Sequence, residues 1–332
     1  YKRQVEILWD SPDIEYFAGA ERLWTFTIDH GRWIKNALPI RWKLDEFSAN
    51  TALTGTWKEA EAVRKAEQER NRWQPYRIMK IVEESRVIKS FYLQPQNGHL
   101  PKFQAGQFLT FRAEVDGNEV IRTYTVSSAP GERYFRISVK LEKAENEHVP
   151  NGLFSSFLHQ NLSVGDSIDA KAPTGAFTFD AAQKRPAVLI SAGVGITPMM
   201  SMARHALLEG IRTRTFRSLT LISSARNHSH RAFFNELNEI SKNSGGAIRS
   251  FWALSRIEKS RQPEVDFHHH GRISKEILQS ILPIDDYEVY LCGPNAFMQT
   301  LYNMLRELGV NDDRIFAEAF GPASLIRDKA PA

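Results

Sequence analysis

The sequence predicts an antiparallel β-barrel followed by an α/β domain with a parallel sheet, after an N-terminal extension of uncertain fold. Two patterns carry this prediction. From residue 76 to about 178, β-branched and aromatic runs are separated by turn sequences such as "QNGHLP" and "APGE", as in antiparallel strands. From residue 185 onward, apolar runs alternate with helical segments, as in a parallel sheet covered on both faces. We therefore place the barrel at 76–180, the α/β domain at 181–324 and a linker at 325–332.

Residues 1–75 differ from the rest because they hold six of the seven tryptophans. We interpret them as an extension, the tail of a preceding domain plus a linker helix. "RLWTFTIDHGRW" alternates in part and predicts a strand and a turn. Residues 57–73 are charged, rich in strong helix formers and free of proline, which predicts a solvated connecting helix.

The region from 76 to 180 is expected to hold five or six strands and one helix, a pattern typical of an antiparallel barrel or sandwich, and the barrel is our prediction. The clearest strands are 76–85, 86–95, 106–115, 119–128 and 134–142. The helix, 153–162, precedes "SVGDSIDAKAP".

The α/β region alternates strands with helices. The strands are expected at 186–191, 218–224, 249–255, 287–293 and 314–320. The helices are expected at 197–210, 231–243, 274–282 and 295–309. Ligands of such sheets bind at the carboxyl ends of the strands.

Composition excludes several classes of function. The net charge of +4 is too small, and the cations too scattered, to indicate a nucleic-acid partner. The single cysteine, Cys292, excludes an internal disulfide and a cysteine-ligated cluster held by this chain alone. It suits a reducing cytoplasm, where we expect the protein. No apolar stretch reaches the roughly 18–20 residues that span a bilayer, so no membrane span is expected.

Two predicted strands end in glycine turns that lead into helices. In "SAGVGITPMM", Gly193 and Gly195 allow a sharp turn and a close approach of the backbone to a ligand. Thr197 is placed to cap the helix and Pro198 fits its first position. The free amides of this helix start suit a pyrophosphate, and a turn that serves packing alone explains the glycines equally well.

The second turn, in "YLCGPNAFM", has the same design around Cys292, Gly293 and Pro294. A lone cysteine without a neighbouring His or Lys is more typical of a buried structural residue than of a nucleophile.

The barrel region carries two further candidates. In "RTYTVSS", Arg122 is able to pair with a phosphate and Tyr124 to stack on a flat ring, and an exposed arginine beside a half-buried tyrosine is the alternative. "NGLFSSF" places Gly152 and Ser155 at a helix start that suits an anion. "FHHH" at 267–270 predicts no metal site, because consecutive side chains diverge.

Seven motifs in order resemble those of the ferredoxin–NADP reductase superfamily: "RTYTVSS", "ISVKLE", "NGLFSSFLH", "APTGAF", "SAGVGITPMMSM", "YLCGPNAFM" and "AEAFGPAS". The resemblance covers about residues 76–324. It is closest to the reductase part of flavohaemoglobins and to the reductases of bacterial oxygenases. It implies a flavin-binding barrel followed by an NAD(P)-binding α/β domain.

The resemblance also implies a set of site residues. The flavin phosphate and ring would be held by Arg122, Thr123, Tyr124 and Thr125. The ribityl or adenine side would be lined by Ser138, Val139 and Lys140. The flavin pyrophosphate would be bound by Gly152, Leu153, Phe154 and Ser155. The nicotinamide nucleotide would be bound by Gly193, Gly195, Thr197 and Pro198. The residues expected beside the reactive rings are Cys292 with Gly293 and Pro294 at the nicotinamide, and Glu318 with Phe320 at the isoalloxazine.

The expected function is a flavin-dependent NAD(P)H reductase that passes electrons to an iron–sulfur or haem acceptor, for an oxygenase. FAD is the expected flavin and FMN the alternative. The acidic residue typical of an NAD site is not evident about 20 residues beyond the glycines. Arg226 either meets a 2′-phosphate of NADPH or lies in a solvated loop, and we favour NADH. The alternatives are a free flavin reductase or oxidase and a nucleotide-sensing module without turnover.

The last residues, "GPASLIRDKAPA", turn to proline, alanine and charge, which is typical of a linker. In the oxygenase reductases that the sequence resembles, a [2Fe–2S] domain held by four cysteines often follows at this point. We therefore expect an iron–sulfur domain past Ala332, a fused or separate acceptor protein as partner, and a further domain before Tyr1. The sequence indicates no oligomeric state.

Overall fold

The computed structural model describes residues 26–29, 32–35, 65, 68–142, 151–257, 267–284, 286–320 and 325–327. The chain divides into two units, Tyr1–Arg72 and Trp73–Ala332. In the first unit, β1 (Phe26–Asp29) pairs antiparallel with β2 (Arg32–Lys35), as the pattern there predicts. Of the connecting helix predicted at 57–73, the structure describes residues 65 and 68–73; residues 65 and 68–70 are helical, as predicted, and the helix ends before residue 71. The domain limits given above remain predictions.

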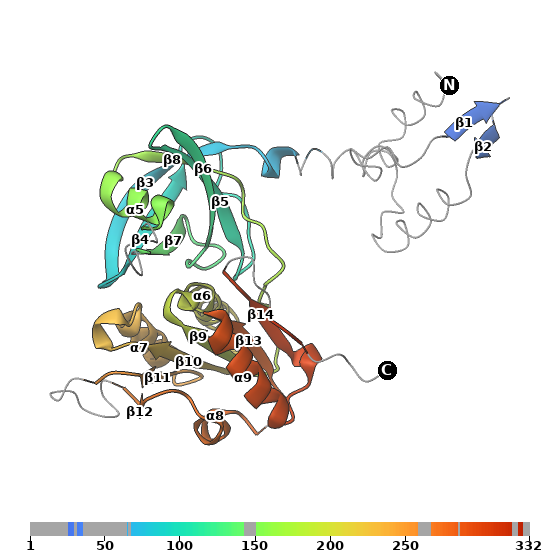
Figure 1. The fold of residues 1–332 in the computed structure, drawn as a ribbon. Helices are drawn as coiled ribbons and strands as arrows, with labels where there is room; N and C mark the ends of the chain where they lie inside the picture. The colour runs from blue at the N-terminus through green and yellow to red at the C-terminus, as the bar shows by residue number, and fades with distance from the viewer. Residues whose placement is uncertain are drawn as a thin grey trace. The chain divides into compact units, whose positions relative to one another are not determined.

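The second unit begins with a six-stranded antiparallel sheet (Figure 1). Its strands are β3 (Gln74–Ser85), β4 (Ile88–Pro95), β5 (Phe108–Val115), β6 (Asn118–Thr125), β7 (Phe135–Lys140) and β8 (Ser167–Ala170). The strand order is β6-β5-β8-β3-β4-β7. An isolated bridge between Val126, just after β6, and Ile137 of β7 joins the two outer strands and closes the sheet into the predicted barrel.

The barrel core is formed by alternate side chains of its strands. In β5 the side chains of Leu109 and Phe111 are buried, whereas the intervening Thr110 is partly exposed, as expected for a strand with one face on the core. The helix α5 (Leu153–Asn161) adds Phe154 and Leu158 to the same core.

The α/β part holds a six-stranded sheet in which all pairs are parallel. Its strands are β9 (Ala187–Ala192), β10 (Leu219–Ala225), β11 (Ile248–Leu254), β12 (His269–His270), β13 (Glu288–Cys292) and β14 (Ile315–Glu318). Its helices are α6 (Ile196–Thr213), α7 (Phe234–Asn243), α8 (Lys275–Ile281) and α9 (Asn295–Glu307). The predicted strands and helices are present; among the described residues of this part, the two-residue β12 and three short 3-10 turns were not predicted.

The strand order β12-β11-β10-β9-β13-β14 reverses direction between β9 and β13. Ligands of open α/β sheets bind outside the carboxyl ends of the strands at such a reversal. The two glycine turns singled out in the sequence follow these two strands, so the topology brings them together.

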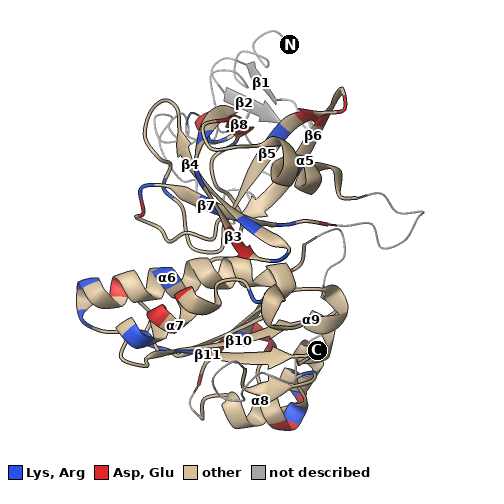
Figure 2. Cartoon of the chain, turned by 90° about the vertical axis from the view of Figure 1, so that its left-hand side faces the viewer, with Lys and Arg blue, Asp and Glu red and all other residues tan. Residues whose placement is uncertain are grey.

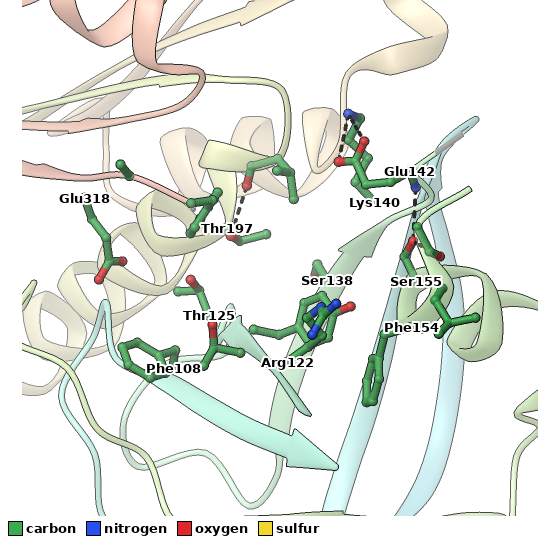
Figure 3. A pocket seen from close by; sticks show the side chains of 17 residues that line it. Phe108, Arg122, Thr125, Ser138, Lys140, Glu142, Phe154, Ser155, Thr197 and Glu318 are labelled. Atoms are coloured by element: carbon green, nitrogen blue, oxygen red, sulfur yellow. Dashed lines mark hydrogen bonds and ion pairs between the residues drawn. The ribbon is translucent and has the colours of Figure 1, made fainter. Parts of the chain in front are cut away.

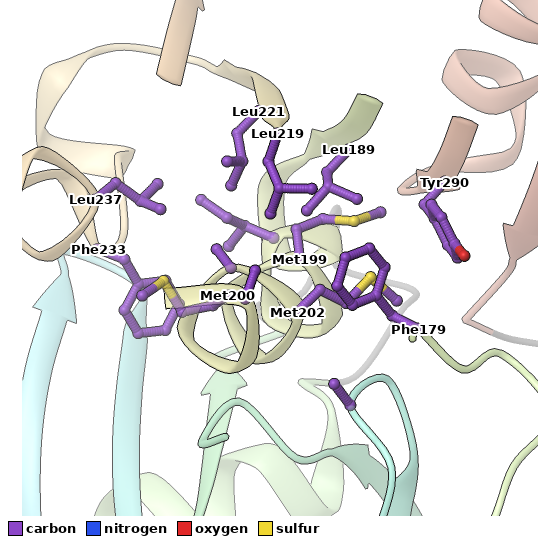
Figure 4. Packing of buried hydrophobic residues seen from close by; sticks show 14 of the residues in the cluster. Phe179, Leu189, Met199, Met200, Met202, Leu219, Leu221, Phe233, Leu237 and Tyr290 are labelled. Carbon is purple, nitrogen blue, oxygen red and sulfur yellow. The ribbon is translucent and has the colours of Figure 1, made fainter. Parts of the chain in front are cut away.

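The helix α6 is buried over most of its length, and its methionines form much of the core (Figure 4). Met199 and Met202 pack in one cluster with Leu189 and Leu221 of the sheet. On another side, Ser201 Oγ donates a hydrogen bond of 2.7 Å to the Ser128 carbonyl of the barrel. A helix enclosed by two layers is apolar on most of its sides, which explains "PMMSMA". Among the described residues, no helix is long and apolar enough to cross a membrane.

Candidate active site

A cleft of about 570 Å³ opens beside β6, β7 and α5 (Figure 3). Its volume falls within the roughly 300–1,000 Å³ of typical ligand sites. Most of the site residues that the sequence predicts line it: Arg122, Thr123, Tyr124, Thr125, Ser138, Lys140, Gly152, Leu153, Phe154, Ser155, Thr197, Glu318 and Phe320. We call it the first cleft. The barrel and the α/β part both contribute to its walls.

The strand β6 supplies the charged and aromatic residues of one wall. The exposed Arg122 donates from Nη1 to the Ile121 carbonyl at 2.7 Å. The ring of Tyr124 lies 6.0 Å from that of Phe111 and 5.9 Å from that of Phe154, centre to centre. Burial raises the pKa of the Tyr124 phenol, so this wall stays neutral there. Because β6 is the outer strand of its sheet, residues from both of its faces can border the cleft.

Alternate residues of the strand β7, Ser138 and Lys140, line the cleft. The buried Ser138 Oγ lies 2.7 Å from Ser90 Oγ and from Ser127 Oγ, and Lys140 Nζ pairs with Glu142 at 2.8 Å. Val139 between them is fully buried in the barrel core and lines no cleft. The structure therefore does not bring the Val139 side chain to the site, because it points to the opposite face of the strand.

The start of α5 forms the next part of the wall. No side chain caps this helix and its first turn holds no acidic residue, so its first amides remain available to an anion. The Ser155 hydroxyl donates to the Gly152 carbonyl at 2.9 Å and accepts from the Glu142 amide at 3.2 Å. A Cβ on Gly152 would lie 2.7 Å from Ser155 Oγ and 2.8 Å from Glu142 Cβ. Glycine is required there by close packing.

The carboxylate of Glu318 is unusual within this cleft. Its Oε2 atom is buried and has no hydrogen-bond partner, and burial raises its pKa to about 7. Phe320, two residues further on, also lines the cleft and is 45% exposed. An unpartnered buried oxygen is costly, and a bound group that donates a hydrogen bond would satisfy it.

Cys292 lies opposite Glu318 in the parallel pair of β13 and β14. Its side chain is fully buried and lines no cleft. Burial and the nearby Glu318 carboxylate raise the pKa of the thiol. Burial and the raised pKa disfavour the nucleophilic thiolate, so we expect Cys292 to act through packing.

The two glycine turns pack against each other. Gly195 has φ of −60°, which any residue adopts, but a Cβ there would lie 2.2 Å from the Cys292 carbonyl oxygen. The glycine at position 195 therefore allows close packing against the backbone at Cys292, and not the predicted close approach to a ligand. Gly193 differs, since it has φ of +57° and open space around its Cα. Gly293 also packs closely, with a Cβ expected 3.2 Å from the Ala192 nitrogen.

The predicted cap of α6 is wrong in detail. A 3-10 turn, Gly193–Gly195, precedes the helix, and Thr197 lies inside its first turn. The Thr197 hydroxyl donates to the Val194 carbonyl at 3.0 Å and so caps no amide. Pro198 follows it and is buried. At the other turn, Pro294 is the residue that precedes α9.

A second cleft, of about 1,100 Å³, adjoins the first. The two clefts share Lys140, Glu142 and Val194 in their linings. Of the other predicted residues, Gly193 and Arg226 line it, whereas Gly195, Pro198, Cys292, Gly293 and Pro294 line neither cleft.

The second cleft also contains residues that the sequence analysis missed. Ser255 follows β11, Arg272 follows β12, and His230 follows β10. Their position after parallel strands was the available signal. Within the "FHHH" segment, His268 Nδ1 accepts a hydrogen bond from the Trp252 amide at 3.1 Å. Within the part of the chain that the structure describes, no group of His, Cys, Asp and Glu could hold a metal ion.

Comparison with known proteins gives matches for both parts. Residues 76–179 match the family described as the oxidoreductase FAD-binding domain, and residues 189–302 match the oxidoreductase NAD-binding domain. A flavohemoprotein of Bacillus subtilis is 35% identical over 271 residues, which are 80% of this chain and 64% of that protein. The chain thus spans about two thirds of the length of this relative.

Solved structures agree with these matches. The flavohem-like FAD/NAD-binding domain of a nitric oxide dioxygenase from Vibrio cholerae is 31% identical, with a TM-score of 0.65. The similarity covers 75% of this chain and 99% of that domain. A phthalate dioxygenase reductase, described as transferring electrons from pyridine nucleotides to [2Fe–2S], is 27% identical with a TM-score of 0.56. That similarity covers 77% of this chain and 70% of the reductase.

Proposed function

Because the chain belongs to the ferredoxin reductase-like family of FAD- and NAD-binding oxidoreductases, we propose that it passes electrons from NAD(P)H through FAD to an iron–sulfur or haem acceptor that serves an oxygenase. The chain is an NAD(P)H-dependent flavoprotein oxidoreductase. The proposal adds the acceptor and the roles of individual residues.

The first cleft is the observation that carries the proposal, since its residues fit a flavin. It combines an exposed cation, Arg122, with the uncapped start of α5 and the unpartnered oxygen of Glu318. We assign the phosphates to Arg122 and to the amides of Leu153 and Phe154, because both offer charge or donors to an anion. FAD bound there would supply the redox chemistry, namely hydride acceptance from NAD(P)H and one-electron transfer to the acceptor.

The remaining work of the protein is positioning. Tyr124 offers an aromatic face fixed by Phe111 and Phe154, and Thr197 lines the same cleft from the start of α6. Walls held rigidly on both sides keep reactants in a near-attack geometry and exclude water. Glu318, which lines the cleft, is able to hold or lose a proton near pH 7.

We assign the nicotinamide nucleotide to the second cleft. Gly193 offers open space at the turn, and Arg226 and Arg272 give the cleft a cationic lining. A cationic lining suits the phosphates of either nucleotide. Comparison of the KM for NADH with that for NADPH tests which one is used, and NADH remains our prediction.

We assign the acceptor by analogy with the similar proteins. The relatives include flavohemoproteins and a reductase that delivers electrons to [2Fe–2S]. The test is NADH-driven reduction, by the full chain loaded with FAD, of a plant-type [2Fe–2S] ferredoxin, of a haem protein, and of free FMN. Reduction of either metalloprotein, well above that of free FMN, would support the proposal. Reduction of free FMN alone would identify a free flavin reductase instead.

A further inference from the structure

A chain of alternating charges joins the barrel to the α/β part. Glu132 and Arg136 come from the barrel, while Arg204 lies on α6 and Glu236 on α7. Arg204 donates from Nε to Glu132 Oε2 at 3.2 Å and from Nη1 to Glu236 Oε1. Arg136 donates from Nη1 to the other oxygen of Glu236 at 2.8 Å. Each part thus contributes one arginine and one glutamate, and we call these four residues the charge network.

The charge network is largely enclosed. The side chain of Arg136 is 2% exposed, that of Glu132 is 13% exposed, and those of Arg204 and Glu236 are each 22% exposed. Tyr134 donates its hydroxyl to Glu132 Oε1 at 2.9 Å, and Arg136 Nη2 donates to the Ser127 carbonyl at 2.8 Å. Removing one member of such a set leaves a buried charge unpaired, and a small sliding of one part over the other does the same. The network therefore favours one relative placement of α6 and the barrel.

The α6 side of the network continues into the first cleft. Thr197, Ser201 and Arg204 are spaced i, i+4 and i+7, so they share one side of the helix. Thr197 lines the cleft, Ser201 donates to the Ser128 carbonyl, and Arg204 enters the network. At 1.5 Å per residue, Arg204 lies only about 10 Å along the axis from Thr197. Figures 1 and 2 show α6 between the barrel strands and the parallel sheet.

The barrel side continues into the same cleft. Arg136 precedes Ser138 and Lys140 on β7 by two and four residues, and both of these line the cleft. Alternate residues share a face of a strand at a rise of about 3.3 Å per residue. A displacement at the network is therefore transmitted to both walls of the cleft through two rigid elements.

We infer that Arg204 and Glu236 are positioning residues, which hold α6 on the barrel and thereby set how closely the nicotinamide ring approaches the flavin. This inference rests on the proposed function. It assigns no contact with either cofactor, since neither residue lines a cleft.

The test compares Arg204→Met with Arg212→Met in the full chain. Arg212 lies on the same helix, is 71% exposed and pairs only locally with Glu209, so its variant is the matched control. Three quantities are measured: the dissociation constants of FAD and NADH, the limiting rate of flavin bleaching at saturating NADH, and hydrogen exchange of residues 127–134. Glu236→Gln keeps the side-chain shape and is the second variant, should Arg204→Met not fold.

We expect Arg204→Met to raise exchange in 127–134 and to lower the limiting rate roughly 10- to 100-fold, because a misplacement of about 1 Å can cost about 100-fold. Both dissociation constants should stay within about twofold. Glu236→Gln should act in the same direction and Arg212→Met should change nothing. An unchanged limiting rate, or a rate lowered only through weaker FAD or NADH binding, would overturn the inference. If the wild-type flavin did not bleach at all, the proposed function would fail, whereas exchange would still report whether Arg204 holds α6 on the barrel.

Discussion

Glu318 and Cys292 lie opposite each other across the parallel strands β14 and β13, and of the two only the carboxylate borders the first cleft. The thiol behind it is fully buried. This arrangement gives the neighbouring residues different roles: one carries a proton that titrates near neutral pH, and the other fills space.

The raised pKa of Glu318 predicts a pH dependence of stability. A carboxyl whose pKa rises from 4.5 unfolded to about 7 folded binds its proton more tightly in the folded state. Its stabilising contribution is full below about pH 4.5 and is lost as the pH rises to about 7. As the pH rises through this range, the melting temperature of Glu318→Gln should therefore increase relative to that of the wild type, because the amide does not ionise. A difference that stays constant with pH would show that Glu318 titrates normally.

The burial of Cys292 predicts an unreactive thiol. In the native chain, a thiol reagent at mildly alkaline pH should modify it only at the rate of unfolding, because burial raises its pKa and blocks access. In denaturant the single thiol should react at once. Cys292→Ala should leave flavin bound and slow bleaching by NADH through looser packing. Rapid labelling of the native protein would place the thiol in the site after all.

The contact between Gly195 and the Cys292 carbonyl predicts a large effect of adding one methyl group. Gly195→Ala should lower the free energy of unfolding by about 3 kcal/mol, at the upper end for overpacking, because the backbone it meets cannot rotate away. Gly246→Ala is the control, since Gly246 has φ of +84° and nothing within 4 Å, and it should cost about 1–2 kcal/mol. Equal losses would argue against a rigid contact between the two turns.

The position of Arg122 predicts a specific loss of flavin affinity. Arg122→Ala removes a charge-assisted contact worth roughly 1.5–3 kcal/mol, which is about 10- to 100-fold in dissociation constant. Lys102→Ala removes an exposed cation of the same part that lines neither cleft, and should have no effect. Titration of the flavin-free chain with FAD, followed by fluorescence, measures both. An unchanged constant for Arg122→Ala would remove Arg122 from the site.

Much of this site could be predicted from the sequence. Strand and helix periodicity located both sheets, and the motifs located Arg122, Ser155 and Glu318, because each motif ties a residue type to a strand end or a helix start. The direction of individual side chains was harder to predict from the sequence. Val139 lies in the middle of a motif yet points into the core, and the 3-10 turn that displaces Thr197 from the cap position has no distinct signal of its own.

Long-range pairing was not predictable in the same way. Glu132 and Arg204 are 72 residues apart and belong to no motif, so only the fold brings them together. Ser255 and Arg272 follow strands whose ends meet at the second cleft, and each lies in a segment without a motif. Their roles follow from topology and not from local sequence.

The visible absorption spectrum of the purified chain, recorded without oxygen before and after adding NADH, tests directly whether the chain binds a flavin that NADH reduces. We expect the chain, supplied with FAD, to keep it through gel filtration and NADH to bleach the flavin bands. A chain that remains colourless after reconstitution with FAD or FMN, or whose bound flavin neither NADH nor NADPH bleaches, would contradict this expectation.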